Sequence, residues 1–412
     1  MITTLVVGGG SIGKRHLKNL LASGRSAGVV ETREDRRAEI ASRLPAVRIF
    51  ASLDEALGAE RFETGFICVP TASHMPPALL LAKAGAHIFM EKPVSHSLDG
   101  IPELLEALQS RSLVGMTGFC MRFFQPLQKA KALLEAGAVG RIVTARSFTG
   151  VYLPDWHPYE DYRSFYMAKK EQGGGVLLDE CHAFDWMQWL CGPIEGLVSV
   201  VATLSDLEVT TDDVCETIVR FQGGAVGSIH LDMVDRSARS EVEIIGTRST
   251  LLVDLEGHTV RLYDHAARTW ETWSFEPAYD RMYVDELEHF FGCVARREPP
   301  QVDLAAGYRV QRAHPRRLRP LQRLGPLGHG GLSGHDPLRA GLDPVVGVWG
   351  WLGEAQPQAS QADMETPDRS GCDDHAVAPA QAQLTCPRRA SSPASTSRPR
   401  TSSRGSGWRD CA

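Results

Sequence analysis

Short apolar runs alternate with segments of helical period over the first 120 residues of the chain. The runs expected to form strands are 3–7, 28–30, 47–51, 64–69 and 87–90, and the segments expected to form helices are 14–21, 36–44, 52–57 and 78–84. Ser52 and Glu55 fit the capping pattern of a helix start. Strands that alternate with amphipathic helices are typical of a doubly wound parallel sheet, which we assign to an α/β domain over residues 1–120.

The pattern changes after residue 120. Seven β-rich runs separated by Gly, Asp or Arg turns are 198–204, 214–221, 225–234, 240–245, 250–255, 259–263 and 269–275. Segment 283–296 then places its large apolar side chains on one helical face. We predict a second domain over residues 121–312, in which these strands form an antiparallel meander.

Residues 313–412 show no sustained period of 2 or 3.6. This segment has 12 Arg, no Lys and nine acidic residues, and it is rich in Pro, Ala, Gly and Ser. Such a composition buries too little apolar surface to offset the entropy of ordering, so we predict a disordered or aberrant low-complexity tail. Two origins stay open for it: the out-of-frame reading of a GC-rich gene, as in a frameshift product, or a natural disordered tail.

The composition narrows the class of protein. Of the 412 residues, 43% are hydrophobic and 23% charged, and the net charge is −6. This charge argues against nucleic acid as a partner, and no apolar run approaches the roughly 18 residues that a membrane span needs. The N-terminus lacks a signal-peptide pattern, and the nine cysteines are scattered without metal-ligand spacing. We therefore expect a cytoplasmic protein with no metal and no membrane partner.

A glycine-rich loop follows the first expected strand. Gly8 allows a tight turn, Gly10 lets backbone approach a pyrophosphate closely, and Gly13 lets the next helix pack on the strand. With Ser11 and Ile12, these residues place free N–H groups and the positive end of a helix dipole toward phosphates. The loop therefore predicts a dinucleotide site.

A carboxylate follows the second expected strand, about 20 residues after the glycines. Glu31 is placed to accept hydrogen bonds from the ribose hydroxyls of the adenosine, and it would repel a 2′-phosphate. This favours NAD over NADP. Arg33 could accept such a phosphate, so NADP stays open as an alternative.

Two further loops come directly after expected strands. Pro70, Thr71 and His74 follow one strand, and Glu91 and Lys92 follow another. In an open α/β sheet, ligands bind in the crevice at the carboxyl ends of the strands. We therefore expect these five residues to lie near the dinucleotide.

Four motifs in this order carry a family resemblance. They are the glycine loop, the run from Val69 to His74, Glu91-Lys92-Pro93, and the segment from Gly173 to Asp185. Over residues 1–312 the chain resembles the glucose–fructose oxidoreductase, inositol dehydrogenase and rhizopine catabolism (Gfo/Idh/MocA) family. The resemblance implies a nicotinamide-binding Rossmann domain and a C-terminal α/β domain with an open, mainly antiparallel sheet. It also implies a small sugar or cyclitol substrate and a homodimer or homotetramer.

The resemblance also suggests the catalytic residues. Lys92 would lie between cofactor and substrate and stabilise the reacting oxygen, and His182 would act as general base or acid. Asp179 is the third candidate. Most members have an Asp-x-x-x-His spacing, whereas this chain has one residue fewer between Asp179 and His182. Both spacings share a helix face, so we expect Asp179 to orient His182 or to touch a substrate hydroxyl.

Residues ahead of the second glycine-rich segment are candidates for binding substrate. Trp156 and Tyr162 offer aromatic faces to sugar C–H groups, and Arg163 could hold a carboxylate or phosphate. The alternative is that this stretch is only a linker between domains. Arg122 either lines the cleft or packs.

These observations predict an NAD(P)-dependent oxidoreductase. It would transfer a hydride between nicotinamide and a secondary alcohol or ketone of a sugar, amino sugar, nucleotide sugar or cyclitol. Two alternatives stay open: an NAD-dependent glycosidase on the same fold, and a non-catalytic regulator that binds the cofactor.

Overall fold

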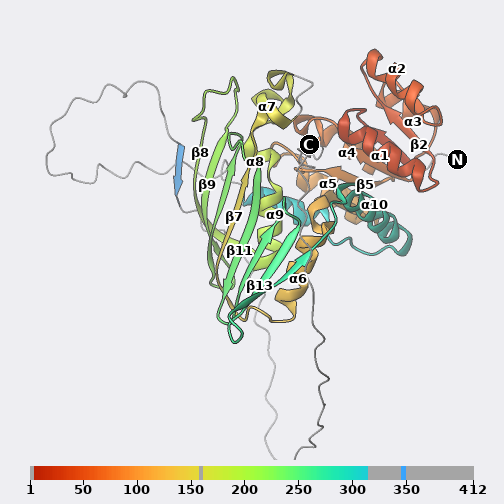
Figure 1. Cartoon of the computed structure of the whole chain (residues 1–412). Helices are drawn as coiled ribbons and strands as arrows, with labels where there is room; N and C mark the ends of the chain where they lie inside the picture. The colour runs from red at the N-terminus through yellow and green to blue at the C-terminus, as the bar shows by residue number, and fades with distance from the viewer. Residues whose placement is uncertain (1–3, 157–160, 314–344, 349–412) are drawn as a thin grey trace, which may run out of the picture. The chain divides into compact units, whose positions relative to one another are not determined.

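A parallel sheet forms the N-terminal half of the protein. The computed structural model describes residues 4–156, 161–313 and 345–348 (Figure 1). The strands of the first sheet are β1 (Thr4–Val7), β2 (Ala27–Val30), β3 (Arg48–Phe50), β4 (Thr64–Ile67), β5 (His87–Glu91) and β6 (Gly115–Gly118). Their order is β3-β2-β1-β4-β5-β6, and every neighbouring pair is parallel. The doubly wound α/β fold is therefore confirmed.

Helices connect these strands, and the first four lie where the periodicity predicts. They are α1 (Ser11–Ala22), α2 (Glu34–Arg43), α3 (Leu53–Ala59), α4 (Met75–Lys83) and α5 (Ile101–Ser110). The Ser52 side chain accepts a hydrogen bond from the Glu55 N–H at 3.1 Å, and Glu55 accepts one from the Ala51 N–H. The predicted cap of α3 is therefore present.

A second, mixed sheet forms the C-terminal half. Its strands are β7 (Ile142–Gly150), β8 (Ile194–Ala202), β9 (Val214–Phe221), β10 (Val226–Asp232), β11 (Arg239–Gly246), β12 (Thr250–Asp254), β13 (Thr259–Asp264), β14 (Thr269–Ser274) and β15 (Val345–Val348). Their order is β14-β13-β12-β11-β7-β10-β9-β8-β15. The prediction of a simple meander is wrong, because β7 lies between β10 and β11 and runs parallel to β10. The other pairs are antiparallel.

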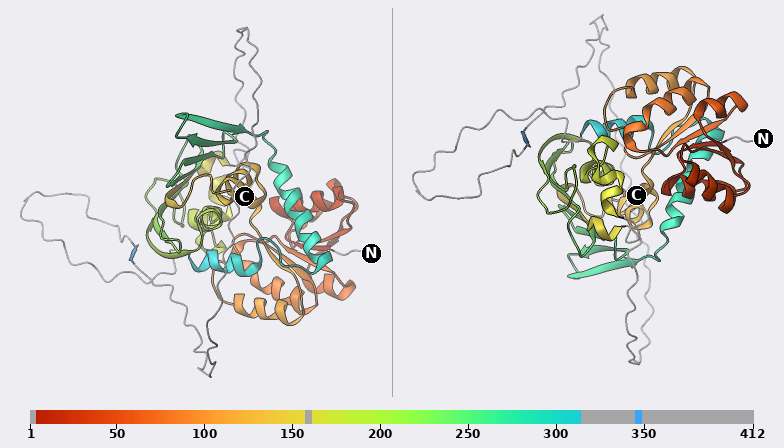
Figure 2. Two further views of the ribbon diagram at one scale, coloured as in Figure 1. Left: turned by 90° about the horizontal axis from the view of Figure 1, so that it is seen from below. Right: turned by 90° about the horizontal axis from the view of Figure 1, so that it is seen from above.

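One face of the second sheet is covered by helices α6 (Gln125–Glu135), α8 (Val176–Asp179) and α9 (His182–Cys191) (Figure 2). Trp186 of α9 is fully buried, and its indole N–H donates to the Ser147 hydroxyl of β7 at 3.0 Å. Phe221 and Ile229 are buried in the same core. This packing fixes α8 and α9, which carry two of the predicted catalytic residues.

Two late helices return to the first sheet. They are α10 (Tyr279–Arg296), which lies beside α1 in both views of Figure 2, and α11 (Leu304–Arg312). Phe290 of α10 meets the rings of Phe66 and Phe89 edge-on at 5.5 and 5.6 Å. The Thr117 N–H of β6 donates to the Val302 carbonyl at 2.9 Å. Residues far apart in sequence therefore complete the core around the first sheet.

Most of the predicted tail lies outside the described residues. Of residues 313–412, the structure describes Ala313 and β15, which pairs with β8 from Val345 to Val348. Within the described ranges, no helix is both long enough and apolar enough to cross a membrane.

The packing of α10 leads to a stability prediction. Phe290→Ala should lower the free energy of unfolding by about 3–5 kcal/mol, because the side chain is fully buried against two aromatic rings. Urea unfolding followed by circular dichroism measures this change. The control is Leu204→Ala at an exposed side chain, which should shift stability by no more than about 0.5 kcal/mol. Equal effects of the two substitutions would contradict the packing role.

Candidate active site

The glycine loop fits a pyrophosphate. Gly8 has a φ of +105°, and a Cβ there would collide with the Cys68 carbonyl. A Cβ on Gly13 would collide with the carbonyl of Gly8. At Gly10, by contrast, no atom lies within 4 Å of the place a Cβ would take, and no side chain caps α1. The first N–H groups of α1, from Ser11 onward, therefore face space that phosphates can fill.

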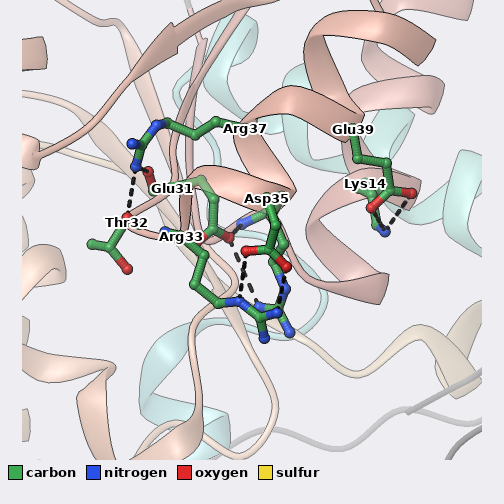
Figure 3. Close-up of polar contacts among 9 residues, drawn as sticks. Lys14, Glu31, Thr32, Arg33, Asp35, Arg37 and Glu39 are labelled. Atoms are coloured by element: carbon green, nitrogen blue, oxygen red, sulfur yellow. Dashed lines mark hydrogen bonds and ion pairs between the residues drawn. The ribbon is translucent and has the colours of Figure 1, made fainter.

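The Glu31 carboxylate is buried at the end of β2 (Figure 3). It accepts hydrogen bonds from the Gly9 N–H at 2.9 Å and the Arg33 N–H at 2.8 Å. The Arg33 guanidinium donates two hydrogen bonds to the Asp35 carboxylate, at 3.1 and 2.5 Å. The ribose end of the predicted site thus holds the Glu31 carboxylate, which favours hydroxyl groups over a phosphate, and the Arg36 guanidinium lies 3.8 Å from its Oε2.

The loop after β4 is tied to the loop after β5. Thr71, which begins the short 3₁₀ helix η1 (Thr71–Ser73) directly after Pro70, is buried. The ring nitrogens of His74 lie 2.9 Å from the Val69 carbonyl oxygen and 3.3 Å from that of Val94. Burial lowers the pKa of His74, so its ring is neutral at pH 7. His74 therefore braces the strand-end loops with its side chain.

The Glu91 carboxylate contacts both His16 and the backbone of Lys92. One carboxylate oxygen of Glu91 lies 2.6 Å from His16 Nε2, and the other accepts the Lys92 backbone N–H at 3.2 Å. His16 is fully buried, and its ring meets Phe89 edge-on. These contacts hold the backbone at the point where the Lys92 side chain leaves the first sheet.

Lys92 and Asp179 join the two halves of the protein. The Lys92 ammonium donates to the Asp179 carbonyl at 2.9 Å and to its Oδ1 at 3.2 Å. Tyr166, in the 3₁₀ helix η4 (Tyr166–Ala168), donates its hydroxyl to the same Oδ1. Burial is the largest influence on the pKa of Lys92 and would lower it. The acidic groups around the ammonium, Asp179 first and then Tyr166, Cys181 and Glu180, together outweigh burial and raise this pKa well above the usual value. Lys92 is therefore a cation at neutral pH.

His182 stands at the start of α9, beside Lys92. Burial, followed by the charge of Lys92, lowers the pKa of His182 well below its usual value, so the imidazole is neutral and can accept a proton. Its Nδ1 is buried and has no hydrogen-bond partner among the described residues. Its ring lies edge-on to Phe119 at 5.6 Å.

Asp179 and His182 do not share a continuous helix. Helix α8 ends at Asp179, and α9 begins at His182, so Glu180 and Cys181 form a turn between them. The described residues show no hydrogen bond between Asp179 and His182. The structure therefore differs from one of our two expectations, that Asp179 orients His182, because Asp179 contacts Lys92 instead. The other, that Asp179 touches a substrate hydroxyl, stays a prediction.

A cavity opens where these residues meet. Its empty space, open solvent included, is about 370 Å³. The residues that line it come from both halves of the protein and are Lys92, Thr149, Val151, Trp156, Glu180, His182, Ser240 and Glu256. Trp156 ends α7 (Leu153–Trp156), and its buried indole N–H has no acceptor among the described residues. Such an N–H can donate to a bound hydroxyl.

Three predicted substrate residues lie elsewhere. Arg122 donates two hydrogen bonds to Asp185, at 2.8 and 2.7 Å, so it packs rather than lining the cavity. The Tyr162 hydroxyl accepts the Glu208 N–H at 3.1 Å. Arg163 is exposed and pairs with Asp161 and Glu208 at 3.6 and 3.3 Å.

Sequence reasoning missed Tyr166, Glu180 and Glu256. Tyr166 follows closely after the aromatic-rich stretch that drew attention to Trp156, and that density was its only signal. Glu180 was visible only as a neighbour of Asp179, and nothing in the sequence marked Glu256. Among the described residues, no group of three His, Cys, Asp or Glu side chains could hold a metal ion.

Comparison with known proteins identifies the family. Residues 2–119 match the model of an oxidoreductase family with an NAD-binding Rossmann fold, and residues 127–252 match the GFO/IDH/MocA C-terminal domain. The chain belongs to the Gfo/Idh/MocA family. The resemblance predicted from the four motifs is thus confirmed, and the protein is an NAD-dependent oxidoreductase.

Relatives within the Gfo/Idh/MocA family are distant in sequence. Myo-inositol 2-dehydrogenase of Thermotoga maritima is 26% identical over 313 residues, which cover 72% of this chain and 89% of the relative. Levoglucosan dehydrogenase of Pseudarthrobacter phenanthrenivorans is 25% identical over 291 residues, which cover 59% of this chain and 74% of the relative. A solved levoglucosan dehydrogenase complexed with NADH and levoglucosan has a TM-score of 0.68 at 23% identity, covering 75% of this chain and 94% of that one, and shows the same fold.

The contact between Lys92 and Asp179 predicts a change in lysine chemistry. Asp179→Asn should lower the pKa of Lys92, because the stabilising charge is lost while burial remains. At pH 8, acetylation of Lys92 by acetic anhydride, measured by peptide mass spectrometry, should rise at least about tenfold, the effect of one pKa unit. Tyr166→Phe is the control, because it removes a hydrogen bond to Asp179 but keeps the charge. Unchanged labelling in Asp179→Asn would refute the coupling.

Proposed function

We propose that the protein oxidises a secondary alcohol of a small polyol, or reduces the corresponding ketone, with NAD. The single observation that carries this proposal is that Lys92 and His182 line one cavity. Lys92 leaves the carboxyl edge of the first sheet, where the glycine loop also lies, whereas His182 comes from the second half. A site of this kind can hold a cofactor and a substrate face to face.

Lys92 and His182 have different roles in the reaction of the alcohol. His182 accepts the hydroxyl proton, since its neutral ring has a free nitrogen. The Lys92 ammonium donates to the same oxygen and stabilises the negative charge that develops there. NAD supplies hydride acceptance when bound. Asp179 and Tyr166 keep Lys92 charged and aimed at the cavity.

The substrate class is a single-ring sugar or cyclitol. The names of the relatives from Thermotoga and Pseudarthrobacter, which act on myo-inositol and levoglucosan, support this class. The polar groups that line the cavity, including the Trp156 indole, Thr149 and Ser240, suit hydroxyl recognition.

We also propose a homodimer or homotetramer through the outer face of the second sheet. Val200, Ile218 and Val226, on adjacent strands, are exposed there although they are large and apolar. Exposed apolar surface of this kind marks an interaction site. Light scattering of the purified protein measures the oligomeric state.

Replacement of Lys92 tests the proposed reaction. Lys92→Met should lower kcat/KM by at least about 10²-fold, the effect of removing a donor to a developing oxyanion, while NAD affinity changes less than about threefold. A panel of sugars and inositols with NAD, followed at the absorbance of NADH, measures turnover, and fluorescence titration measures NAD binding. Lys83→Ala, at an exposed lysine, is the control.

The outcomes of that experiment separate the alternatives. Retained turnover in Lys92→Met would overturn the proposed role of this residue. Consumption of glycosides by the wild-type protein without net NADH would favour a glycosidase, and NAD binding without any turnover would favour a regulator.

Cofactor choice gives a second prediction. The wild-type protein should bind NAD more tightly than NADP, and Glu31→Gln should reduce that preference about tenfold, because it removes a negative charge facing the 2′ position. Calorimetric titration with both cofactors measures the ratio, with Glu34→Gln at an exposed position of α2 as control. An unchanged ratio in Glu31→Gln would show that Glu31 does not select the cofactor.

A further inference from the structure

The cavity carries more acidic than basic side chains. Its cation is Lys92, whose charge is already matched by Asp179. Glu180 and Glu256 add two carboxyl groups to the lining, and none of the described lining residues is an arginine. An anionic substrate group would therefore meet an unfavourable field.

Glu180 is one of the lining residues whose polar groups have no partner among the described residues. It lies in the turn between α8 and α9, and only 7% of its surface is exposed. Among the described residues, its carboxyl group makes no hydrogen bond and no ion pair, although it borders the cavity. A buried carboxyl group without a partner is costly, so this position points to a partner on the substrate.

The surroundings of Glu180 favour a cation. Burial raises the pKa of Glu180 to about 8, and the charges of Asp179, Glu256 and Asp232 act in the same direction, against Lys92. Asp232, at the end of β10, is in turn paired with His230 at 2.9 Å. At pH 7 the carboxyl group therefore holds its proton among three other acidic groups. A positive charge beside it would relieve their repulsion.

We propose that the substrate carries a protonated amine that binds Glu180, so that its class is an amino sugar or an aminocyclitol. This inference rests on the proposed function and adds a recognition group to it. An ammonium group supplies three hydrogen-bond donors and a positive charge, which complements the acidic lining of the cavity. The ring then presents its secondary alcohol to Lys92 and His182.

Uronates and phosphorylated sugars carry negative charges, so they fit the acidic lining of the cavity poorly. Arg122, one arginine that could have received them, is held by Asp185 in a bidentate pair. Arg163, the other, is paired with Asp161 and Glu208 at the surface. Neither lines the cavity.

A comparison of matched substrates tests selectivity. 2-Amino-2-deoxy-scyllo-inositol and scyllo-inositol differ only by an amine in place of a hydroxyl, as do glucosamine and glucose, and glucuronate supplies an anion. The wild-type protein with NAD should favour the amine over its hydroxyl analogue by at least about tenfold in kcat/KM in one of these pairs, and should act least on glucuronate.

Variants at Glu180 assign this selectivity to one residue. Glu180→Gln should reduce the amine-to-hydroxyl ratio at least about tenfold, and Glu180→Asp should keep part of it. Glu171→Gln makes the same substitution at an exposed position and should leave the ratio unaltered. A wild-type preference for the hydroxyl analogue, or a preference for the amine that survives in Glu180→Gln, overturns the inference.

Proton release provides a readout that does not need turnover. When an ammonium group binds at pH 7, Glu180 should ionise and release about one proton. Titration of the NADH complex with the two amines, in buffers of different ionisation enthalpy, measures this number. Release in the wild type and its loss in Glu180→Gln support the inference, whereas no binding or no release contradicts it.

The results also separate this inference from the proposed function. Turnover of neutral cyclitols that requires Lys92, with no preference for amines, would refute only the amine recognition. Proton-coupled binding of amines without turnover of any probe would refute only the proposed oxidation.

Discussion

The buried contact between Lys92 and Asp179 joins the two sheets of this protein beside the cavity that we propose as its active site. Lys92 extends from the carboxyl edge of the parallel sheet, and Asp179 ends a short helix packed on the second sheet. Both side chains are almost fully buried. Because two opposite charges removed from water must remain together, this pair fixes how the cofactor half faces the substrate half.

The same pair sets the protonation of its neighbours. Asp179 keeps Lys92 charged, and the charge of Lys92 adds to burial in keeping His182 neutral. An ammonium beside a neutral imidazole is the combination that an alcohol dehydrogenation needs, since one group stabilises an oxyanion and the other accepts a proton. Glu180 borders the same cavity, and burial, followed by the charge of Asp179, raises its pKa to about 8. Burial and this ion pair together therefore set the charges around the cavity.

The sequence predicts the first sheet well, because local pattern determines it. The alternation of strands and helices up to β5, the glycine loop and the Ser52 cap depend on neighbouring residues and appear where expected, whereas α5 and β6 were not among the predicted elements. The place of β7 was not predictable in this way, because strand periodicity does not encode which strand lies beside it. Likewise, no local signal shows that Phe290 completes the core around the first sheet.

The site was predicted in its residue types more than in its contacts. Lys92, His182 and Trp156 line the cavity. Arg122 and Arg163 do not line it and are paired with acidic side chains. A guanidinium pairs with whichever carboxylate the fold brings near, and Asp185 and Glu208 are such partners. The role of Asp179 changed because the chain turns at Glu180 instead of continuing one helix.

A double-mutant cycle on Lys92→Met and Asp179→Asn tests the central claim most directly. The free energy of unfolding in urea would be measured for the wild type, both single variants and the double variant. Each single variant should lose about 3–5 kcal/mol by leaving a buried charge or its partner alone, and the double variant should lose clearly less than the two losses together. Additive losses would contradict the account, because they would show that the two residues do not stabilise each other.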